Sequence, residues 1–451
     1  MTTASTPPRS LPLPLRLLIA PLLWVERARG RRRSALIALY VVALLIAGVL
    51  SWRQFNLRHL PDVGEPFDIA AFEARTVPDA ENAFLRYRDA MSQFKPIDSK
   101  AVRANPKIGK ETDWGRADPE LRRWVEDNRE ALALWLEGAE RPQALAVPLK
   151  EMAVNTNLAA VQHLREFARL ALLEGSRREQ EGDMAGAWAL YRALLRSSRH
   201  AGMNGGAIQR LIGLALLGQA GPRVTTWAED PRVDATLLRR AIDDMAACQA
   251  MTPPNSDMAK VEYLITRKML AEPHRWKQWG INALSDPTRA YNHFPYAVEV
   301  KLFLRREPER SQRIARLVYA QYLAQCDRPP EQRAKLVDPE FMIYATDPSA
   351  PPAARALSPE ALRDWTKSSL FSSVFAPLST VQGRFDGERL AFDLIRLNLA
   401  EQCYRREHGA LPKTYGDLVG PYLKELPEGY DPADVPARPE PEGRSDTAKQ
   451  P

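Results

Sequence analysis

Residues 158–200 read LAAVQHLREFARLALLEGSRREQEGDMAGAWALYRALLRSSRH, and their apolar side chains recur every three or four positions. That spacing places them on one face of an α-helix. Glu181-Gly182-Asp183 interrupts the pattern and has turn-forming residues. A second apolar stripe follows the turn: Ala187, Trp188, Tyr191, Leu194 and Leu195. The stretch therefore predicts two helices joined by a tight turn.

Helical spacing continues on both sides of this hairpin. Downstream helices are predicted at about 207–220, 234–250 and 257–271. Upstream, Asp79 is placed to cap one helix, and Asp118 is placed to cap another that runs to about Gly138. Strand-like alternation is scarce. We therefore expect a mainly α fold, an irregular helical bundle or short α-solenoid, with its helical domain at residues 80–344.

The hairpin resembles a single tetratricopeptide-type repeat. The resemblance rests on small and aromatic residues at the spacings that let the two helices pack closely: Gly175, Gly182, Asp183, Ala187 and Tyr191. Ala171 and Arg178 stand where that pattern prefers aromatic residues, and no second copy follows at the required period. An irregular bundle therefore fits the sequence better than a repeat array.

Residues 34–52, SALIALYVVALLIAGVLSW, form an uncharged apolar run that directly follows Arg31-Arg32-Arg33. Nineteen residues of helix span roughly 28 Å, close to the hydrocarbon thickness of a bilayer. This predicts a transmembrane helix that contacts the lipid bilayer. By the positive-inside tendency, the basic leader at 1–33 is expected in the cytoplasm and everything after Arg53 across the membrane.

Two other interpretations of the N-terminal region remain open. A cleaved signal peptide fits poorly, because the basic region is too long and no small-x-small site follows the apolar run. Residues 11–25 are also apolar, but this stretch is short and contains Arg16 and three prolines, so we expect it in the membrane interface. If residues 11–25 did insert, the C-terminal bulk would return to the cytoplasm.

Three stretches of distinct composition divide the rest of the chain. Residues 53–79 are rich in Pro and Gly and predict an extended stalk, and residues 345–358 predict a surface linker. Residues 359–426 form a C-terminal helical segment. The Pro- and charge-rich residues 427–451 predict a disordered tail.

The C-terminal segment carries a second resemblance. Residues 387–408 predict an amphipathic helix with the apolar stripe Leu390, Leu394, Leu397, Ala400 and Tyr404. Gly409 is placed to stop it, and Leu411-Pro412 follows. This arrangement resembles a segment of pseudopilin-like domains and of a group of uncharacterised bacterial membrane-anchored proteins. The words PDVGEPF (61–67) and VPDAENAF (77–84) resemble the same group.

The resemblance to this group implies an envelope protein and carries no known activity. In a pseudopilin the helix follows the membrane anchor directly, whereas a long insertion separates the two here. Assembly into a pilus-like fibre is therefore not expected.

The distribution of charge argues against a nucleic-acid partner. The chain has a formal net charge of +7, and six of these charges belong to residues 1–33, which hold seven Arg and one Glu. The remainder is nearly neutral. Its Arg pairs, such as Arg122-Arg123 and Arg239-Arg240, lie among acidic residues and indicate solvated helix faces.

No motif specifies a reaction, a metal or a cofactor. His163 and Glu166 are one helical turn apart, but no third ligand lies at a diagnostic spacing, so we expect neither to bind metal. Adjacent Asp243 and Asp244 point about 100° apart around a helix and do not form a shared acid pair. His293, in an aromatic stretch at 272–310, is the best candidate for a general base.

Three cysteines, Cys248, Cys326 and Cys403, lack metal or redox spacing. One pair could form a disulfide in an oxidising compartment, but three small buried residues without chemistry are the simpler expectation.

The sequence predicts a binding or scaffolding protein of the cell envelope, and we expect an envelope protein as its partner. The partner groove is expected along the hairpin, with Trp188, Tyr191 and Arg192 as contacts. Two alternatives stay open: an envelope hydrolase or other enzyme using His293, and a secretion or envelope-assembly component using its C-terminal segment.

Overall fold

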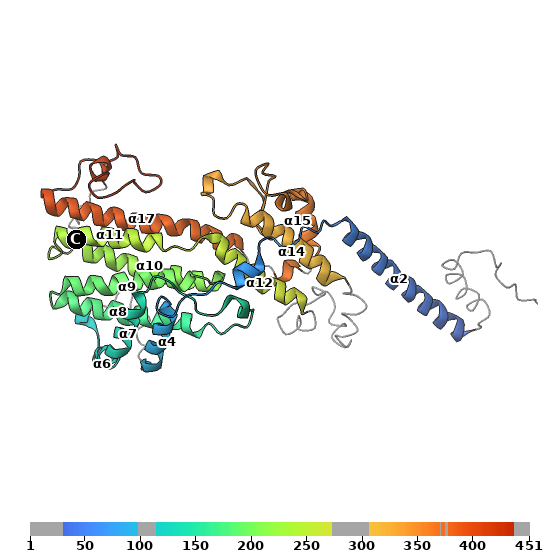
Figure 1. Ribbon diagram of the computed structural model, residues 1–451, viewed down its shortest axis with the longest axis horizontal. Helices are drawn as coiled ribbons and strands as arrows, with labels where there is room; N and C mark the ends of the chain where they lie inside the picture. The colour runs from blue at the N-terminus through green and yellow to red at the C-terminus, as the bar shows by residue number, and fades with distance from the viewer. Residues whose placement is uncertain (1–29, 98–113, 273–305, 370, 375–377, 437–451) are drawn as a thin grey trace, which may run out of the picture.

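The computed structural model describes residues 30–97, 114–272, 306–369, 371–374 and 378–436. Across these ranges the chain is mainly helical, as predicted (Figure 1). One helix, α2 (Arg31–His59), projects from a helical body. The helices of the body are α3 (Ile69–Glu73), α4 (Ala83–Gln93), α6 (Pro119–Asp127), α7 (Arg129–Ala139), α8 (Ala159–Gln180), α9 (Met184–Gly202), α10 (Ala207–Glu229), α11 (Ala235–Ala250), α12 (Asn255–Ala271), α14 (Glu307–Leu323), α15 (Pro359–Lys367), α16 (Phe371–Val374) and α17 (Leu378–His408).

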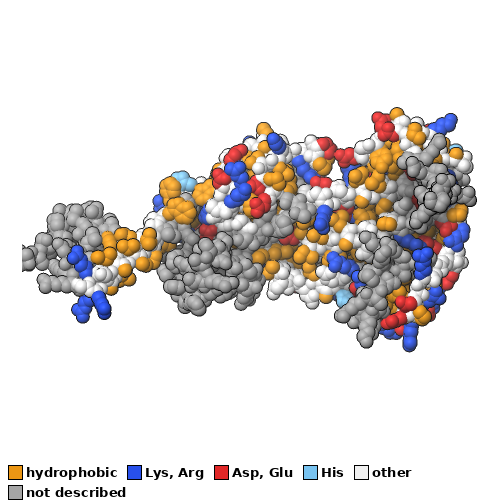
Figure 2. Space-filling model, turned by 180° about the vertical axis from the view of Figure 1, so that it is seen from behind, with side chains coloured by type: hydrophobic (Ala, Val, Ile, Leu, Met, Phe, Trp, Pro, Cys, Tyr) orange, Lys and Arg blue, Asp and Glu red, His pale blue; other side chains and the backbone are white. Residues whose placement is uncertain are grey.

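Helix α2 is long and apolar enough to cross a membrane, and none of its most apolar 18-residue window is buried. Figure 2 shows hydrophobic side chains along this rod and basic side chains at its far end, where Arg31, Arg32 and Arg33 begin the helix. The helix continues seven residues beyond Trp52, the predicted end of the apolar run, and stops at His59.

The helical hairpin forms as predicted from α8 and α9. Gly182 adopts a positive φ of 86° in the turn between them, a conformation that suits glycine. Asp183 caps α9 by accepting a hydrogen bond from the Gly186 amide at 2.8 Å. Helix α9 then packs against α10, so the hairpin continues into a third helix instead of ending at a surface.

The helix that Asp79 was predicted to cap starts three residues later than expected. Asn82 is the capping residue of α4, and its side-chain oxygen accepts from the Phe84 amide at 3.1 Å. The delay has a backbone cause: Ala83 donates to the Gln143 carbonyl at 2.8 Å, and Gln143 donates to the Glu81 carbonyl at 3.2 Å. The residues before Asn82 are held by this bridge and do not enter the helix.

The predicted helix from Asp118 to Gly138 is interrupted. Asp118 caps α6 as expected, accepting from the Leu121 amide at 2.8 Å, but α6 ends at Asp127 and α7 begins at Arg129. Asn128 between them is fully buried. Its side chain bonds the amide and carbonyl of Lys95, so a contact with another part of the chain accompanies the break.

The described residues of the body form two large hydrophobic cores and two small clusters. The larger combines α4 and α6 to α11 with the second half of α17, and the smaller combines α12, α14, α15 and a short hairpin with the start of α17. The hairpin pairs β1 (Leu336–Asp338) with β2 (Ile343–Tyr344) in antiparallel orientation. Because α10 and α17 contribute to both cores, they join the two parts into one body.

The predicted stalk at 53–79 instead packs on the body. Leu60 is buried in the smaller core, and the Phe67 ring contacts Tyr263 of α12 with centroids 5.6 Å apart. Phe72 of α3 is also buried, and Arg75 pairs with Asp257 at 3.0 Å. The Pro and Gly content predicted that residues 53–79 would extend away from the body, but these apolar side chains pack the segment against it.

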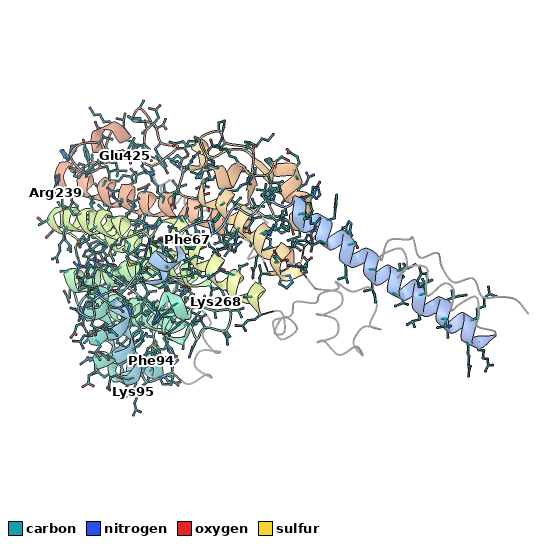
Figure 3. The ribbon with its side chains drawn as sticks, turned by 45° about the vertical axis from the view of Figure 1, so that its right-hand side comes forward. Phe67, Phe94, Lys95, Arg239, Lys268 and Glu425 are labelled. Carbon is teal, nitrogen blue, oxygen red and sulfur yellow. The ribbon has the colours of Figure 1, made fainter. Side chains whose placement is uncertain are left out.

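Figure 3 shows Phe67 within the body and Arg239 and Glu425 at the end far from α2.

Two other boundaries differ from the prediction. The linker at 345–358 contains a 3-10 turn, Pro352–Arg355, and its Ala350 and Ala354 pack against Ala320 of α14. The predicted tail begins later than 427, because the Tyr415 amide donates to the Asp434 carbonyl at 2.9 Å and returns residues 427–436 to the body. Residues 437–451 lie outside the described part of the chain.

Helix α17 begins nine residues before the predicted start and ends at His408, where Gly409 has a φ of +75°. The predicted apolar stripe is only partly buried: Leu390 and Leu394 are each 38 % exposed. Leu397 and Ala400 of that stripe are buried, together with Phe385, Phe392 and Leu399, which the stripe did not include. The face of α17 that packs on α10 and α11 also contains polar residues. The apolar periodicity of the sequence therefore did not identify this face.

Candidate functional site

The structure places Trp188 inside the body and not on a groove. Its indole is 2 % exposed and stacks on Trp227 of α10 with ring centroids 5.0 Å apart. The indole nitrogen donates to Asp244 of α11 at 2.8 Å. Trp188 therefore joins α9, α10 and α11, and it has no surface to offer a partner in this conformation.

Tyr191 is also buried. Its hydroxyl donates to Glu179 at 2.6 Å and accepts from Arg223 Nε at 3.0 Å. Burial raises the pKa of Tyr191 above its usual value. Arg192 is partly exposed, but it pairs with Glu140 of the α7 end and with Asp244 at 3.4 Å. The three residues expected to contact a partner instead pack inside the body or form ion pairs within it. Helices α10 and α11 cover the face of the hairpin on which the partner groove was predicted.

Of the two histidine candidates, the structure describes only His163. His293 lies outside the described residues. His163 packs edge-on near Phe94 with centroids 6.3 Å apart, and Glu166 pairs with Arg169 at 3.0 Å, so these two do not form a metal pair. Among the residues that the structure describes, no group of three or more His, Cys, Asp or Glu side chains is arranged to hold a metal ion.

His200 holds a buried network that sequence reasoning missed. Its Nδ1 lies 2.7 Å from the Tyr87 hydroxyl and its Nε2 lies 2.9 Å from the Arg141 carbonyl. Burial lowers the pKa of His200 to about 3, so the ring stays neutral near pH 7. A neutral ring that donates from Nε2 and accepts at Nδ1 satisfies both contacts and ties α9 to α4.

Two buried arginines share one carboxylate where the two cores meet. Arg199 of α9 and Arg210 of α10 contact Glu388 of α17 at 2.6 and 3.2 Å, and all three side chains are at least 95 % buried. Each guanidinium also lies 4.3 Å from a ring centroid, Phe392 for Arg199 and Phe385 for Arg210. Burial lowers the pKa of Arg199. The cluster links three helices across the body.

The three cysteines are buried free thiols. Burial raises the pKa of Cys248 to about 12 and that of Cys403 to about 11. Thiols held in the protonated form are poor nucleophiles and poor metal ligands. The structure therefore agrees with small buried residues and does not pair any two of them.

Hydrogen bonds and ion pairs join the end of α2 to the body. Arg313 of α14 donates from Nη1 to the carbonyls of Leu57 and Leu60 at 3.2 and 3.1 Å. Carbonyls at a helix C-terminus have no partner within the helix, and a cation there is favoured by the helix dipole. Arg313 therefore caps the end of α2 from another element.

Acidic residues after α2 complete the junction. Arg316 contacts Asp62 at 2.9 Å and Glu65 at 3.1 Å. Tyr263 of α12 also donates to Glu65. Burial raises the pKa of this tyrosine, and the nearby Glu65 carboxylate raises it further. We call Asp62, Glu65, Arg313 and Arg316 the anchor clamp. Its two acidic residues belong to the motif PDVGEPF, which the sequence analysis singled out. Their arginine partners lie some 250 positions later in the chain, so the sequence did not indicate the pairing.

The chain matches no protein-family model, no curated protein and no solved structure. The resemblances described from the sequence therefore gain no support from relatives.

Proposed function

We propose that this is a single-pass membrane protein that holds a helical binding or scaffolding body at a fixed place beside the bilayer, with its N-terminus in the cytoplasm and its body on the other side. The observation that carries the proposal is the combination of an apolar, unburied α2 with the anchor clamp at its end. These contacts hold the body in one position relative to the end of α2.

A protein partner from the cell envelope is part of the same proposal. The resemblance of the C-terminal segment to pseudopilin-like domains and of the hairpin to a tetratricopeptide-type repeat supports an envelope role. Since Trp188 and Tyr191 are buried, the contact surface has to be sought elsewhere. Leu390 and Leu394 are exposed one turn apart on α17, so they are the first positions to alter.

Crosslinking in native membranes tests the partner. The full-length chain, a control that ends after α2, and a Leu390→Asp, Leu394→Asp variant are crosslinked, purified and identified by mass spectrometry. An envelope protein captured by the full chain, absent from the control and lost in the variant would support the proposal. An Ile208→Asp variant is the matched control, because Ile208 is exposed on another helix. A body that captures nothing would favour the enzyme alternative.

A further inference from the structure

The contacts of the anchor clamp set the direction of α14. Leu57 and Leu60, which lie nearer the apolar segment, contact Arg313. Asp62 and Glu65, which lie farther from it, contact Arg316. Residue numbers rise together along both elements. The start of α14 therefore points back along α2, toward the bilayer in which α2 is proposed to lie.

Helix geometry places this end of the body close to the lipid surface. Leu57 follows Trp52 by five residues, about 7.5 Å of helix. The polar layer on each side of a bilayer is about 5–8 Å thick, so the carbonyl that Arg313 caps lies near the outer edge of that layer. Arg306 precedes Arg313 by seven residues, about 10.5 Å of helix, so the first two turns of α14 span the headgroup layer.

The side chains at this end include exposed cations. Arg58 and His59 are exposed on the last turn of α2. The Arg306 side chain is 49 % exposed beside α14, where it pairs with Glu309 at 2.9 Å. Lipid phosphates carry the opposite charge, so Lys and Arg side chains near an anionic surface are attracted to it. Surface ion pairs such as Arg306 with Glu309 are weak enough to exchange partners.

We propose that this end of the body, formed by the last turn of α2 and the first turn of α14, binds anionic lipid headgroups through Arg58 and Arg306. The inference rests on the proposed membrane anchor and adds a second, polar contact with the same bilayer. Because the anchor clamp makes α2 and α14 one unit, headgroup binding sets the tilt of the whole body. The body then leans toward the side of α2 that carries α14.

The test uses the full-length chain reconstituted in vesicles of phosphatidylcholine alone or with three parts in ten phosphatidylglycerol. A nitroxide is attached through Gln312→Cys, a half-buried position beside the clamp, and its relaxation by nickel-chelating lipid reports distance from the headgroup plane. The three native cysteines are buried and label slowly. The proposal predicts stronger relaxation in the anionic vesicles and a loss of that difference in 0.5 M salt.

Substitutions identify the residues responsible. Arg58→Ser with Arg306→Ser is expected to abolish the dependence on phosphatidylglycerol, a shift of roughly tenfold or more in the equilibrium between contact and no contact. Arg240→Ser is the control, because its side chain is 66 % exposed on α11 and belongs to neither element of the junction. Equal relaxation in both vesicle types, or a dependence that survives the double substitution, would overturn the proposal.

Vesicle flotation after alkaline extraction separates this inference from the proposed function. A chain that floats but shows no lipid dependence keeps its anchor and loses only the headgroup contact. A chain that does not float contradicts the membrane anchor, and with it both proposals. Added inorganic phosphate that removed the lipid dependence at constant ionic strength would show that a free anion site, not a lipid surface, had been measured.

Discussion

Gly175 of α8 lies directly beneath the ring of Tyr191 on α9. A Cβ at this position would lie 2.5 Å from the nearest ring carbon, so the buried ring would have to move and lose its bond to Glu179. We expect Gly175→Ala to lower the free energy of unfolding by about 1–3 kcal/mol. Urea unfolding of the full-length chain in detergent measures this change.

Gly218 of α10 provides the matched control. No atom lies within 4 Å of a Cβ built there, and alanine favours helix over glycine by about 0.5–1 kcal/mol. Gly218→Ala is therefore expected to be neutral or stabilising. Equal unfolding midpoints for the two variants would show that the close packing of α8 on α9 is wrong.

Glu388 is the only carboxylate recorded in contact with Arg199 and Arg210 among the described residues. Glu388→Gln leaves two buried guanidinium groups without a counter-charge, and breaking such a pair costs about 3–5 kcal/mol. The expected result is a large fall in thermal stability. Glu425→Gln removes an exposed contact with Arg389 and should change stability by about 0.5 kcal/mol or less. Similar effects of the two substitutions would contradict the buried cluster.

At the residue scale, the sequence identified which side chains share a face but not what covers that face. Trp188 and Tyr191 stand on the predicted stripe of their helix, yet they contact Trp227, Asp244 and Arg223 from helices later in the chain. Periodicity carries no information about such a second layer. The same limit explains the buried arginines, since a charged residue in a helical pattern is normally assigned to solvent.

At the scale of elements, the contact between α17 and the segment after Gly409 should depend on pH. Burial raises the pKa of Glu401 on α17 to about 7, with Tyr415 of the segment opposing the shift. A carboxyl whose folded pKa exceeds its unfolded value binds its proton more tightly when folded. The contribution of Glu401 to the free energy of unfolding is therefore greatest below about pH 4.5 and is lost as the pH rises through about 7.

Hydrogen exchange measures this dependence. Amides of residues 411–426 are expected to exchange with more protection at pH 5 than at pH 8, after correction for intrinsic rates, and Glu401→Gln should remove most of the difference. Neighbouring Glu407 does not titrate in this range, because Arg239 and Tyr422 hold its pKa near 2. Unchanged behaviour in Glu401→Gln would assign the pH effect to another group.

Element boundaries were predictable where local chemistry decides them. Asp118, Gly182 and Gly409 mark a helix start, a turn and a helix end, and each acts through its own side chain or backbone. Asn82 and Asn128 decide boundaries through distant partners, because their side chains bond Leu145 and Lys95. These roles could not be seen in a window of sequence. Long-range contacts thus account for the errors in α4, α6 and α7.

At the scale of the whole molecule, α10 and α17 join two cores, and the anchor clamp joins this body to α2. Arg313→Ala with Arg316→Ala is expected to uncap α2 and free residues 60–66. Limited proteolysis of the detergent-solubilised chain should then cut between α2 and the body several times faster. Arg239→Ala, at the far end of the body, should leave that rate unchanged. Equal rates would mean that the clamp does not hold the junction.

The proposed function requires that α2 cross the membrane. The measurement is labelling of single engineered cysteines by a membrane-impermeant maleimide in right-side-out membrane vesicles, with Ser10→Cys before α2 and Glu181→Cys on the exposed turn of the body. If α2 crosses the membrane, the body position is labelled in intact vesicles and the N-terminal position only after permeabilisation. Labelling of both positions, or of the N-terminal position alone, in intact vesicles would contradict it.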